Sequence, residues 1–259
     1  MSSELYEVRP DGTRRAVTRA WVPEAPVALE FNGLSYAVMM ATPDSLEDFA
    51  TGFALNEGLA ANAAEISDIA VAQVPDGWIV RAHLSGLGID KLTDRVRSRV
   101  AESSCGLCGI DNLAEVARAL PQVAAHAANE PTAIFAALAA LRPLQQLTHQ
   151  TGAAHAAAWA SSEGEIGLLR EDVGRHNALD KLVGAMALAG RPLNPGFVIS
   201  TARCSYEIVE KAVRAGASTL VCVSLPTSLA AERAQAAGLS LWALARDDSV
   251  LLVNDGAII

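Results

Sequence analysis

The second half of the chain alternates short apolar runs with helical patterns, and this alternation constrains the fold more than any other feature of the sequence. When strands alternate with helices, crossover connections place the strands parallel in one sheet with helices on its faces. A strand pair is also expected at 155–160 and 165–170, around a Ser-Ser-Glu-Gly turn. The sequence therefore predicts an α/β domain with a mostly parallel central sheet covered on both faces. The expected helices are 175–188, 206–215 and 228–237, and the other expected strands are 197–200, 219–224, 240–245 and 250–253.

The first half differs, because two β-hairpins are expected in place of the alternation. Residues 27–41 turn at Asn32-Gly33, a dipeptide typical of hairpin turns that need positive φ at both central residues. Residues 66–84 turn at Pro75-Asp76-Gly77. Between the hairpins, Thr42-Pro43-Asp44 is expected to open a helix, since proline is tolerated in a first turn.

Three segments are expected along the chain. Residues 1–20 form a polar tail, residues 21–115 a smaller α+β region that ends in a cysteine loop, and residues 116–259 the main α/β domain, which N-terminal strands could complete. Further helices are expected at 89–100, 113–120 and 131–141.

The composition limits what the chain can bind and where it works. The formal net charge is −9 and no basic run or aromatic-rich stripe is present, so general nucleic-acid binding is not expected. No window of about 18 apolar residues is free of charge, so no membrane span is expected. The N-terminus lacks an apolar signal core, which predicts a reducing cytoplasm, where thiols serve chemistry or metals more often than structural bridges.

A pair of cysteines lies in Ser104-Cys105-Gly106-Leu107-Cys108-Gly109. The glycines let the backbone take positive φ and bring amide groups near a sulfur atom. A helix is expected to start near Asp111, and a thiol near a helix N-terminus has a lowered pKa that favours attack on a donor persulfide. A structural zinc site, a dithiol redox pair, a persulfide carrier and an inert loop with two buried thiols all remain open from these residues.

The residues around the pair give little support to metal chemistry. A structural zinc site needs four ligands, and no second Cys-x-x-Cys or His-x-His accompanies the pair. Zinc deaminases carry His-x-Glu followed by Pro-Cys-x-x-Cys, whereas Ser104 stands in place of that proline and no His-x-Glu precedes it. A thioredoxin-type pair follows a strand and opens a long helix, but here a helix and two serines come first. No metal ligands are therefore assigned.

A second polar motif runs from Arg170 to Gly184, where an expected strand meets a helix. The carboxyl ends of strands are where open α/β sheets bind ligands. Asp172 could cap the helix, Arg175 and His176 fall in its first turn, and the free amide groups there could meet an anion. The alternative is a capped helix whose charges are satisfied at the surface.

Together with the cysteine loop, this motif closely resembles the formate dehydrogenase accessory sulfurtransferase family, FdhD. The resemblance covers nearly the whole chain, with the motifs in the same order. The other motifs that carry it are Ala41-Thr42-Pro43, Leu46-Glu47-Asp48-Phe49-Ala50-Thr51-Gly52-Phe53 with Glu57-Gly58, Thr151-Gly152 with His155-Ala156-Ala157, Ser200-Thr201-Ala202-Arg203-Cys204-Ser205-Tyr206-Glu207-Ile208-Val209, and Ser224-Leu225-Pro226-Thr227-Ser228-Leu229-Ala230.

The resemblance implies a specific activity. Members of the family are cytoplasmic homodimers that take persulfide sulfur from a cysteine desulfurase. They pass it to the bis-guanine-dinucleotide molybdenum cofactor, a bound substrate that then serves formate dehydrogenase. The resemblance also implies a three-layer fold similar to that of the cytidine deaminases, with a smaller extra domain. By position, Cys105 matches the persulfide cysteine and Cys108 its partner.

The resemblance also implies where the cofactor binds. His155, Arg175, His176 and Arg203 fall inside matching motifs and are candidates for cofactor contact. The family's C-terminal cofactor-contacting stretch matches Leu244, Ala245, Arg246, Asp247, Asp248 and Ser249. The chain departs from the family pattern at Ala153, at Ala202 and at Ala243-Leu244. The last of these stands in place of Gly-Phe and removes an aromatic ring that could stack on a guanine.

Two cysteines and two other functions complete the expectations. Cys204 follows a strand end beside Arg203 and is interpreted as a local substitution, whereas Cys222 lies in a continuous apolar strand and is expected in the core. The other functions are a molybdenum-cofactor chaperone without sulfur chemistry and a metal-dependent hydrolase on a deaminase-like fold.

Overall fold

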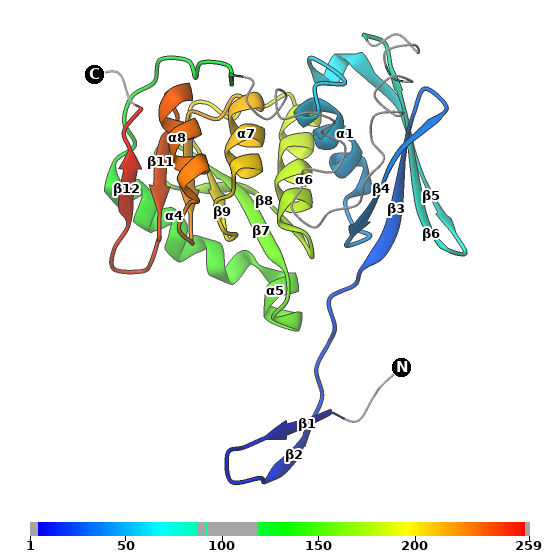
Figure 1. The fold of residues 1–259 in the computed structure, drawn as a ribbon, viewed down its shortest axis with the longest axis vertical. Coiled ribbons are helices and arrows are strands. Elements are labelled where there is room, and N and C mark those ends of the chain that lie inside the picture. The colour runs from blue at the N-terminus through cyan, green and yellow to red at the C-terminus, as the bar shows by residue number, and fades with distance from the viewer. Residues whose placement is uncertain (1–4, 87–91, 93–118, 257–259) are drawn as a thin grey trace.

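The computed structural model describes residues 5–86, 92 and 119–256. Its largest element is a six-stranded sheet with the strand order β12-β11-β10-β9-β7-β8 (Figure 1). The elements of this part are α4 (Pro131–Leu144), α5 (Gln146–Thr151), β7 (His155–Ala160), β8 (Ile166–Asp172), α6 (Arg175–Leu188), β9 (Phe197–Ser200), α7 (Tyr206–Arg214), β10 (Thr219–Cys222), α8 (Ser228–Ala237), β11 (Ser240–Ala243) and β12 (Leu251–Asn254).

The centre of this sheet is parallel and its flanks are antiparallel. β10 pairs in parallel with β9 and β11, whereas β7 runs antiparallel to β8 and β9, and β12 antiparallel to β11. The sheet is therefore mixed, where the sequence predicted a mostly parallel one. The reason is connection length, because a parallel pair needs a crossover of roughly a dozen residues. Residues 161–165 join β7 to β8 and residues 244–250 join β11 to β12, too few for a crossover.

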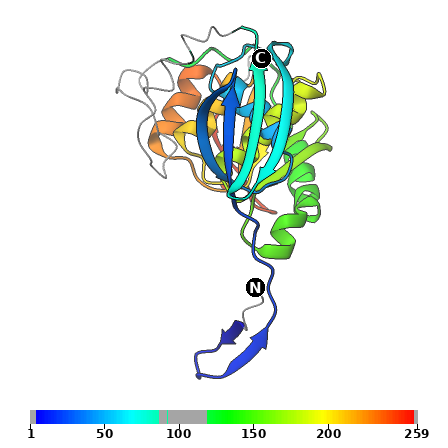
Figure 2. The same cartoon turned by 90° about the vertical axis from the view of Figure 1, so that its right-hand side faces the viewer.

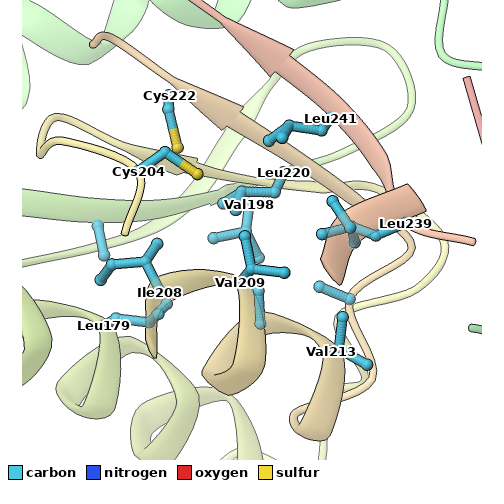
Figure 3. Close-up of a cluster of buried hydrophobic side chains, with 14 of the residues drawn as sticks. Leu179, Val198, Cys204, Ile208, Val209, Val213, Leu220, Cys222, Leu239 and Leu241 are labelled. Atoms are coloured by element: carbon cyan, nitrogen blue, oxygen red, sulfur yellow. The ribbon is translucent and has the colours of Figure 1, made fainter. Parts of the chain in front are cut away.

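Helices cover both faces of the sheet, as the sequence predicted. α6, α7 and α8 lie on one face and α4 on the other (Figure 1). Successive strand residues point to opposite faces, so Leu220 of β10 joins the core under α7, shown in Figure 3, while Val221 joins the core under α4. Whether these layers follow the cytidine deaminases in detail stays a prediction.

A second sheet of four strands is built from the two expected hairpins. Its order is β4-β3-β6-β5, and a parallel pairing of β3 with β6 joins the hairpins. Asn32 and Gly33 take φ values of 51° and 78°, which confirms the positive φ expected at the first turn. The elements are β3 (Ala25–Phe31), β4 (Leu34–Ala41), α1 (Leu46–Asn56), η1 (Ala63–Glu65), β5 (Ile66–Val74) and β6 (Gly77–Leu84).

The four-stranded sheet forms an outer layer with α1 packed behind it (Figure 2). Buried aromatic rings join the two, with the ring centroid of Phe53 in α1 6.4 Å from that of Phe31 and 5.9 Å from that of Tyr36. Leu92 is fully buried in the same core. The rest of the expected helix at 89–100, the expected helix at 113–120 apart from its last two residues, and the domain boundary at 115 lie outside the described residues.

The expected polar tail holds a small hairpin. β1 (Leu5–Val8) and β2 (Arg14–Val17) pair antiparallel and stand away from both sheets (Figures 1 and 2). An ion pair joins Arg15 to Glu7 across the two strands, with 3.0 Å between Nη2 and Oε2.

The two sheets are connected through direct backbone contact between α1 and α6. A Cβ atom added to Gly52 would lie 1.8 Å from the carbonyl oxygen of Asp180, and one added to Gly184 would lie 1.8 Å from that of Asp48. No side chain larger than hydrogen fits at either position, so the glycines allow the helix axes to approach closely.

We predict that Gly184→Ala destabilises the protein. Alanine favours a helix over glycine by about 1 kcal/mol, but the clash with the rigid backbone of α1 should outweigh this gain and lower the free energy of unfolding by roughly 1–3 kcal/mol. Urea denaturation measures the difference. Ala187→Ser, at a half-buried position on the same helix, is the control and should change stability little. Equal or higher stability of Gly184→Ala would contradict the close helix contact.

Candidate functional site

A fully buried ion pair lies at the start of the polar motif. Lys181 Nζ is 2.7 Å from Asp172 Oδ2, and both side chains have no exposed surface. Asp172 also accepts hydrogen bonds from the Gly174 backbone N–H at 2.7 Å and from Asn177 Nδ2 at 3.0 Å. These charges are therefore buried and structural, in place of the satisfied surface charges that one interpretation of the motif expected.

Thr42 ties this pair to the N-terminal region. Its backbone N–H donates to Asp172 Oδ2 at 3.0 Å and its carbonyl accepts from Lys181 Nζ at 2.9 Å. Its hydroxyl accepts from the Val173 backbone N–H at 3.1 Å. One threonine between β4 and α1 thus supplies three hydrogen bonds to the strand-to-helix junction of the main sheet.

A second buried carboxylate, Asp180 in α6, repeats the arrangement. Asp180 accepts from Lys211 Nζ at 2.8 and 2.9 Å and from Asn56 Nδ2 at 2.6 Å. Burial raises the pKa of Asp180, and the Lys211 ammonium acts against that shift. Asp180 therefore connects α6 to both α7 and the end of α1.

The N-terminus of α6 carries Arg175 and His176 toward His155 at the start of β7. Burial, followed by the charges of Arg175 and Lys211 and the nearby His155, lowers the pKa of His176 to about 3. Burial and the charge of Arg175 also lower the pKa of His155. Both imidazoles are consequently neutral at pH 7, and each can offer one donor and one acceptor.

Several polar atoms at this point are buried without a hydrogen-bond partner among the described residues. They include Arg175 Nε, His176 Nε2 and Ser205 Oγ. His176 Nε2 lies 3.9 Å from Glu207 Oε2, too far for a hydrogen bond. Ser205 is the N-cap of α7, and its side chain makes no cap hydrogen bond. Buried polar groups are rarely left unpaired, so this cluster fits a site that a polar ligand completes.

A cavity of about 1000 Å³ opens at the carboxyl edge of the six-stranded sheet. Strand ends form its floor, and α4 and α5 form its opposite wall. The Arg246 side chain bends back across the end of β10 and donates to the Val223 carbonyl. The cavity is lined by Leu138, Leu141, Arg142, Gln145, Thr148, His149, Ala154, His155, Thr201, Val223, Ala245, Arg246, Asp247 and Asp248.

The structure brings part of the expected site together. His155, Ala245, Arg246, Asp247 and Asp248 line the cavity. Arg175 and His176 lie close to His155, because the charge of Arg175 shifts the pKa of His155 and His155 shifts the pKa of His176.

Other expected site residues lie elsewhere. Arg203, Leu244 and Ser249 are exposed and are not among the described residues that line the cavity. Cys105 and Cys108 lie outside the described residues, so their assignment stays a prediction.

Sequence reasoning missed the wall formed by α5, which contributes Thr148 and His149. Glu171 holds this short helix, because its carboxylate accepts from the backbone N–H groups of Leu147 and Thr148 at 2.7 and 2.8 Å. It also accepts from the Thr148 hydroxyl at 2.6 Å. A helix of six residues is too short to show periodicity, and its capping residue lies more than 20 positions later in the chain.

Within residues 5–86, 92 and 119–256, no group of three or more His, Cys, Asp or Glu side chains could hold a metal ion. Among the helices of the same residues, none combines the length and apolar character that crossing a bilayer requires.

Comparison with known proteins identifies the family. Residues 22–256 match the model of the FdhD/NarQ family. The chain belongs to this family. It is 45% identical over 253 residues to a protein named sulfur carrier protein FdhD from Variovorax paradoxus, covering 97% of this chain and 91% of the relative. A Cupriavidus necator protein of the same name is 44% identical over 223 residues, which cover 86% of this chain and 77% of the relative.

A solved structure shares the fold. The crystal structure of a protein named as a formate dehydrogenase accessory protein, from Desulfotalea psychrophila, matches with a TM-score of 0.77. The match covers 100% of this chain and 99% of that chain at 24% sequence identity. At this identity the likeness concerns the fold alone, and it supports the arrangement of two sheets described above.

We predict that His176→Gln reduces the loss of stability on acidification. The pKa of an unfolded histidine is about 6.5, and that of His176 in the folded chain is about 3. Between these values the unfolded state binds more protons. Folding stability should therefore fall as pH drops below the unfolded value, by up to about 1.4 kcal/mol per pH unit. Glutamine removes this titration and keeps a polar group.

Urea denaturation at several values between about pH 7 and pH 5 tests this. The exposed His83, changed to glutamine, is the control and should leave the pH dependence as in the parent. Equal slopes for the parent and His176→Gln would show that His176 is not held neutral by the fold.

Proposed function

We propose that this protein is a sulfur carrier that accepts persulfide sulfur from a cysteine desulfurase and transfers it to the bis-guanine-dinucleotide molybdenum cofactor used by formate dehydrogenase. In this proposal Cys105 attacks the donor persulfide and Cys108 assists. Family membership over residues 22–256 and relatives named sulfur carrier protein FdhD support the carrier role. The observation that most favours a large bound substrate is the cavity of about 1000 Å³ at the carboxyl edge of the sheet.

The charges around this cavity suit a guanine dinucleotide. Arg142 and Arg246 line it and can pair with phosphate oxygens, since guanidinium groups bind phosphate in a fork. Asp247 and Asp248 line the same space, and carboxylates accept hydrogen bonds of the kind that the guanine edge donates. The neutral His155 stands between these residues and the α6 N-terminus, where unpaired donors could meet the rest of the cofactor.

The proposal extends to the protein's partners and setting. A desulfurase must reach Cys105, and a formate dehydrogenase must receive the sulfurated cofactor. We further propose a homodimer in the cytoplasm. Cofactor binding and sulfur transfer can be tested separately, because different residues are proposed for each. The residues that line the cavity belong to the main sheet and its helices, whereas the thiols are those of Cys105 and Cys108.

We predict that Cys105→Ala abolishes sulfur loading. After incubation with a cysteine desulfurase and cysteine, mass spectrometry of the intact parent should show the gain of one sulfur atom, because the thiolate of Cys105 takes the terminal sulfur of the donor persulfide. Cys204→Ala is the matched control, since Cys204 is fully buried in the core and should not compete for the donor. Normal loading of Cys105→Ala would refute the assignment.

The same variant separates a carrier from a chaperone. In a strain that lacks the accessory protein, Cys105→Ala should fail to restore formate dehydrogenase activity. Restoration by a variant that lacks both Cys105 and Cys108 would instead show a cofactor chaperone without sulfur chemistry.

We predict that Arg246→Gln weakens the binding of guanosine diphosphate by roughly tenfold or more, the effect of losing a charged hydrogen bond worth about 1.5–3 kcal/mol. Glutamine keeps a donor for the Val223 carbonyl, so the strand end stays supported. Titration calorimetry measures the affinity. Arg81→Ala, on the four-stranded sheet, removes a positive charge far from the cavity and should bind as the parent does. Unchanged affinity of Arg246→Gln would place the nucleotide elsewhere.

A further inference from the structure

Cys204 and Cys222 form a pair of adjacent thiols that the proposed sulfur transfer does not use. Both are fully buried in the core between the sheet and α7, and both are free. Figure 3 shows their two sulfur atoms next to one another. The hydrogen bond that the Cys222 thiol makes to Cys204, together with burial, raises the pKa of Cys222 well above its usual range. The two sulfur atoms are therefore neighbours although 17 residues separate the cysteines in sequence.

The two cysteines are held by backbone of different kinds. Cys222 ends β10, a central strand paired on both sides, and its carbonyl accepts from the Ala245 backbone N–H at 3.2 Å. Cys204 lies in the loop between β9 and α7, held by a single bridge to Pro226 and by a hydrogen bond from the Thr227 N–H to its carbonyl at 3.0 Å. Loops open locally at lower free energy than central strands. Cys204 is accordingly the thiol that a solvent oxidant reaches first.

The loop that carries Cys204 also contributes to the candidate site. Thr201 lines the cavity, and Arg203 is exposed next to Cys204. Ser205 is the N-cap of α7, and its hydroxyl has no hydrogen-bond partner among the described residues. A covalent bond from Cys204 to β10 would hold this loop against the central strand. Chemistry at the buried pair would thereby fix Thr201, which lines the cavity.

We propose that Cys204 and Cys222 form a disulfide when the protein meets a hydroperoxide, and that this bond fixes the loop 201–205. The Cys204 thiol attacks the peroxide, the O–O bond breaks, and Cys204 becomes a sulfenic acid with release of water, or of an alcohol from an organic peroxide. The Cys222 thiol then attacks the sulfenic sulfur, the S–O bond breaks, and a second water leaves with the thiol proton. Two thiols are oxidised and one peroxide is reduced.

Burial sets the rate of this reaction. The thiolate is the attacking form, and the raised pKa of Cys222 keeps that thiol protonated until its neighbour is oxidised. The slow step is local opening of the loop, and closure brings Cys222 against the sulfenic acid before further oxidation. The pair therefore differs from a single buried cysteine, which has no partner to resolve the oxidised form.

The test uses the full chain with Cys105→Ser and Cys108→Ser, so that only the buried pair can react. After treatment with hydrogen peroxide under native conditions, intact mass should fall by two hydrogen atoms, both thiols should disappear together, and dithiothreitol should restore them. Peptide mapping without reduction should join the segments that contain residues 204 and 222. Hydrogen exchange of the amides at 201–205 should slow several-fold in the oxidised form.

Two matched variants in the same background identify the steps. With Cys222→Ser, dimedone should trap a sulfenic acid at Cys204, whereas with Cys204→Ser the native protein should form neither adduct nor disulfide. Thermal melting of both variants establishes that they fold. If peroxide oxidises the pair only in urea and leaves both thiols free in the folded protein, the proposal is overturned. Oxidation of Cys204 to a sulfinic acid while Cys222 is present would overturn it equally.

Discussion

The buried ion pair between Asp172 and Lys181 is the interaction on which the rest of the structure depends. Removing an ion from water costs several kcal/mol, and the cost is met only when every lone pair and proton finds a partner. Thr42, Asn177 and the backbone N–H of Gly174 supply those partners. Because Thr42 lies between β4 and α1, the charges can be satisfied only when the four-stranded sheet is docked on the main sheet. The pair thus makes the two sheets one cooperative structure.

In helix α6, the residues that hold the two sheets together and the residues of the candidate site occupy different positions. Asn177, Asp180, Lys181 and Gly184 recur at three- and four-residue spacing, which places them on one face. That face meets α1 and residues 40–56 through hydrogen bonds and through the contact at Gly184. Arg175 and His176 precede this series, at the free N-terminal turn. Because the rest of the helix is anchored, its first turn is held beside His155 without a further loss of conformational entropy.

The sequence predicted elements well and polar partnerships poorly, for a physical reason. Apolar periodicity is local, so α6 and β9 have the bounds that the pattern predicted. Asp172 and Asp180 each have one partner more than 120 residues away, Thr42 and Asn56, and no local pattern shows these two partners. Glu171 and the wall formed by α5 escaped for the same reason, because the capping carboxylate comes from a later strand. Long-range polar pairing is what the sequence alone left undetermined.

The antiparallel flanks of the main sheet, of which the sequence predicted the strand pair at 155–160 and 165–170 alone, are what assemble the cavity. In a parallel sheet the start of a strand lies at the edge opposite to the ends of its neighbours. β7 runs antiparallel to β9, so its first residue, His155, meets the edge where β9, β10 and β11 end. The hairpin return then carries the end of β8 to the same edge, which places the α6 N-terminus beside His155. A wholly parallel arrangement would have separated the histidine from Arg246, so the short connection at 161–165 determines the site as directly as any residue that lines it.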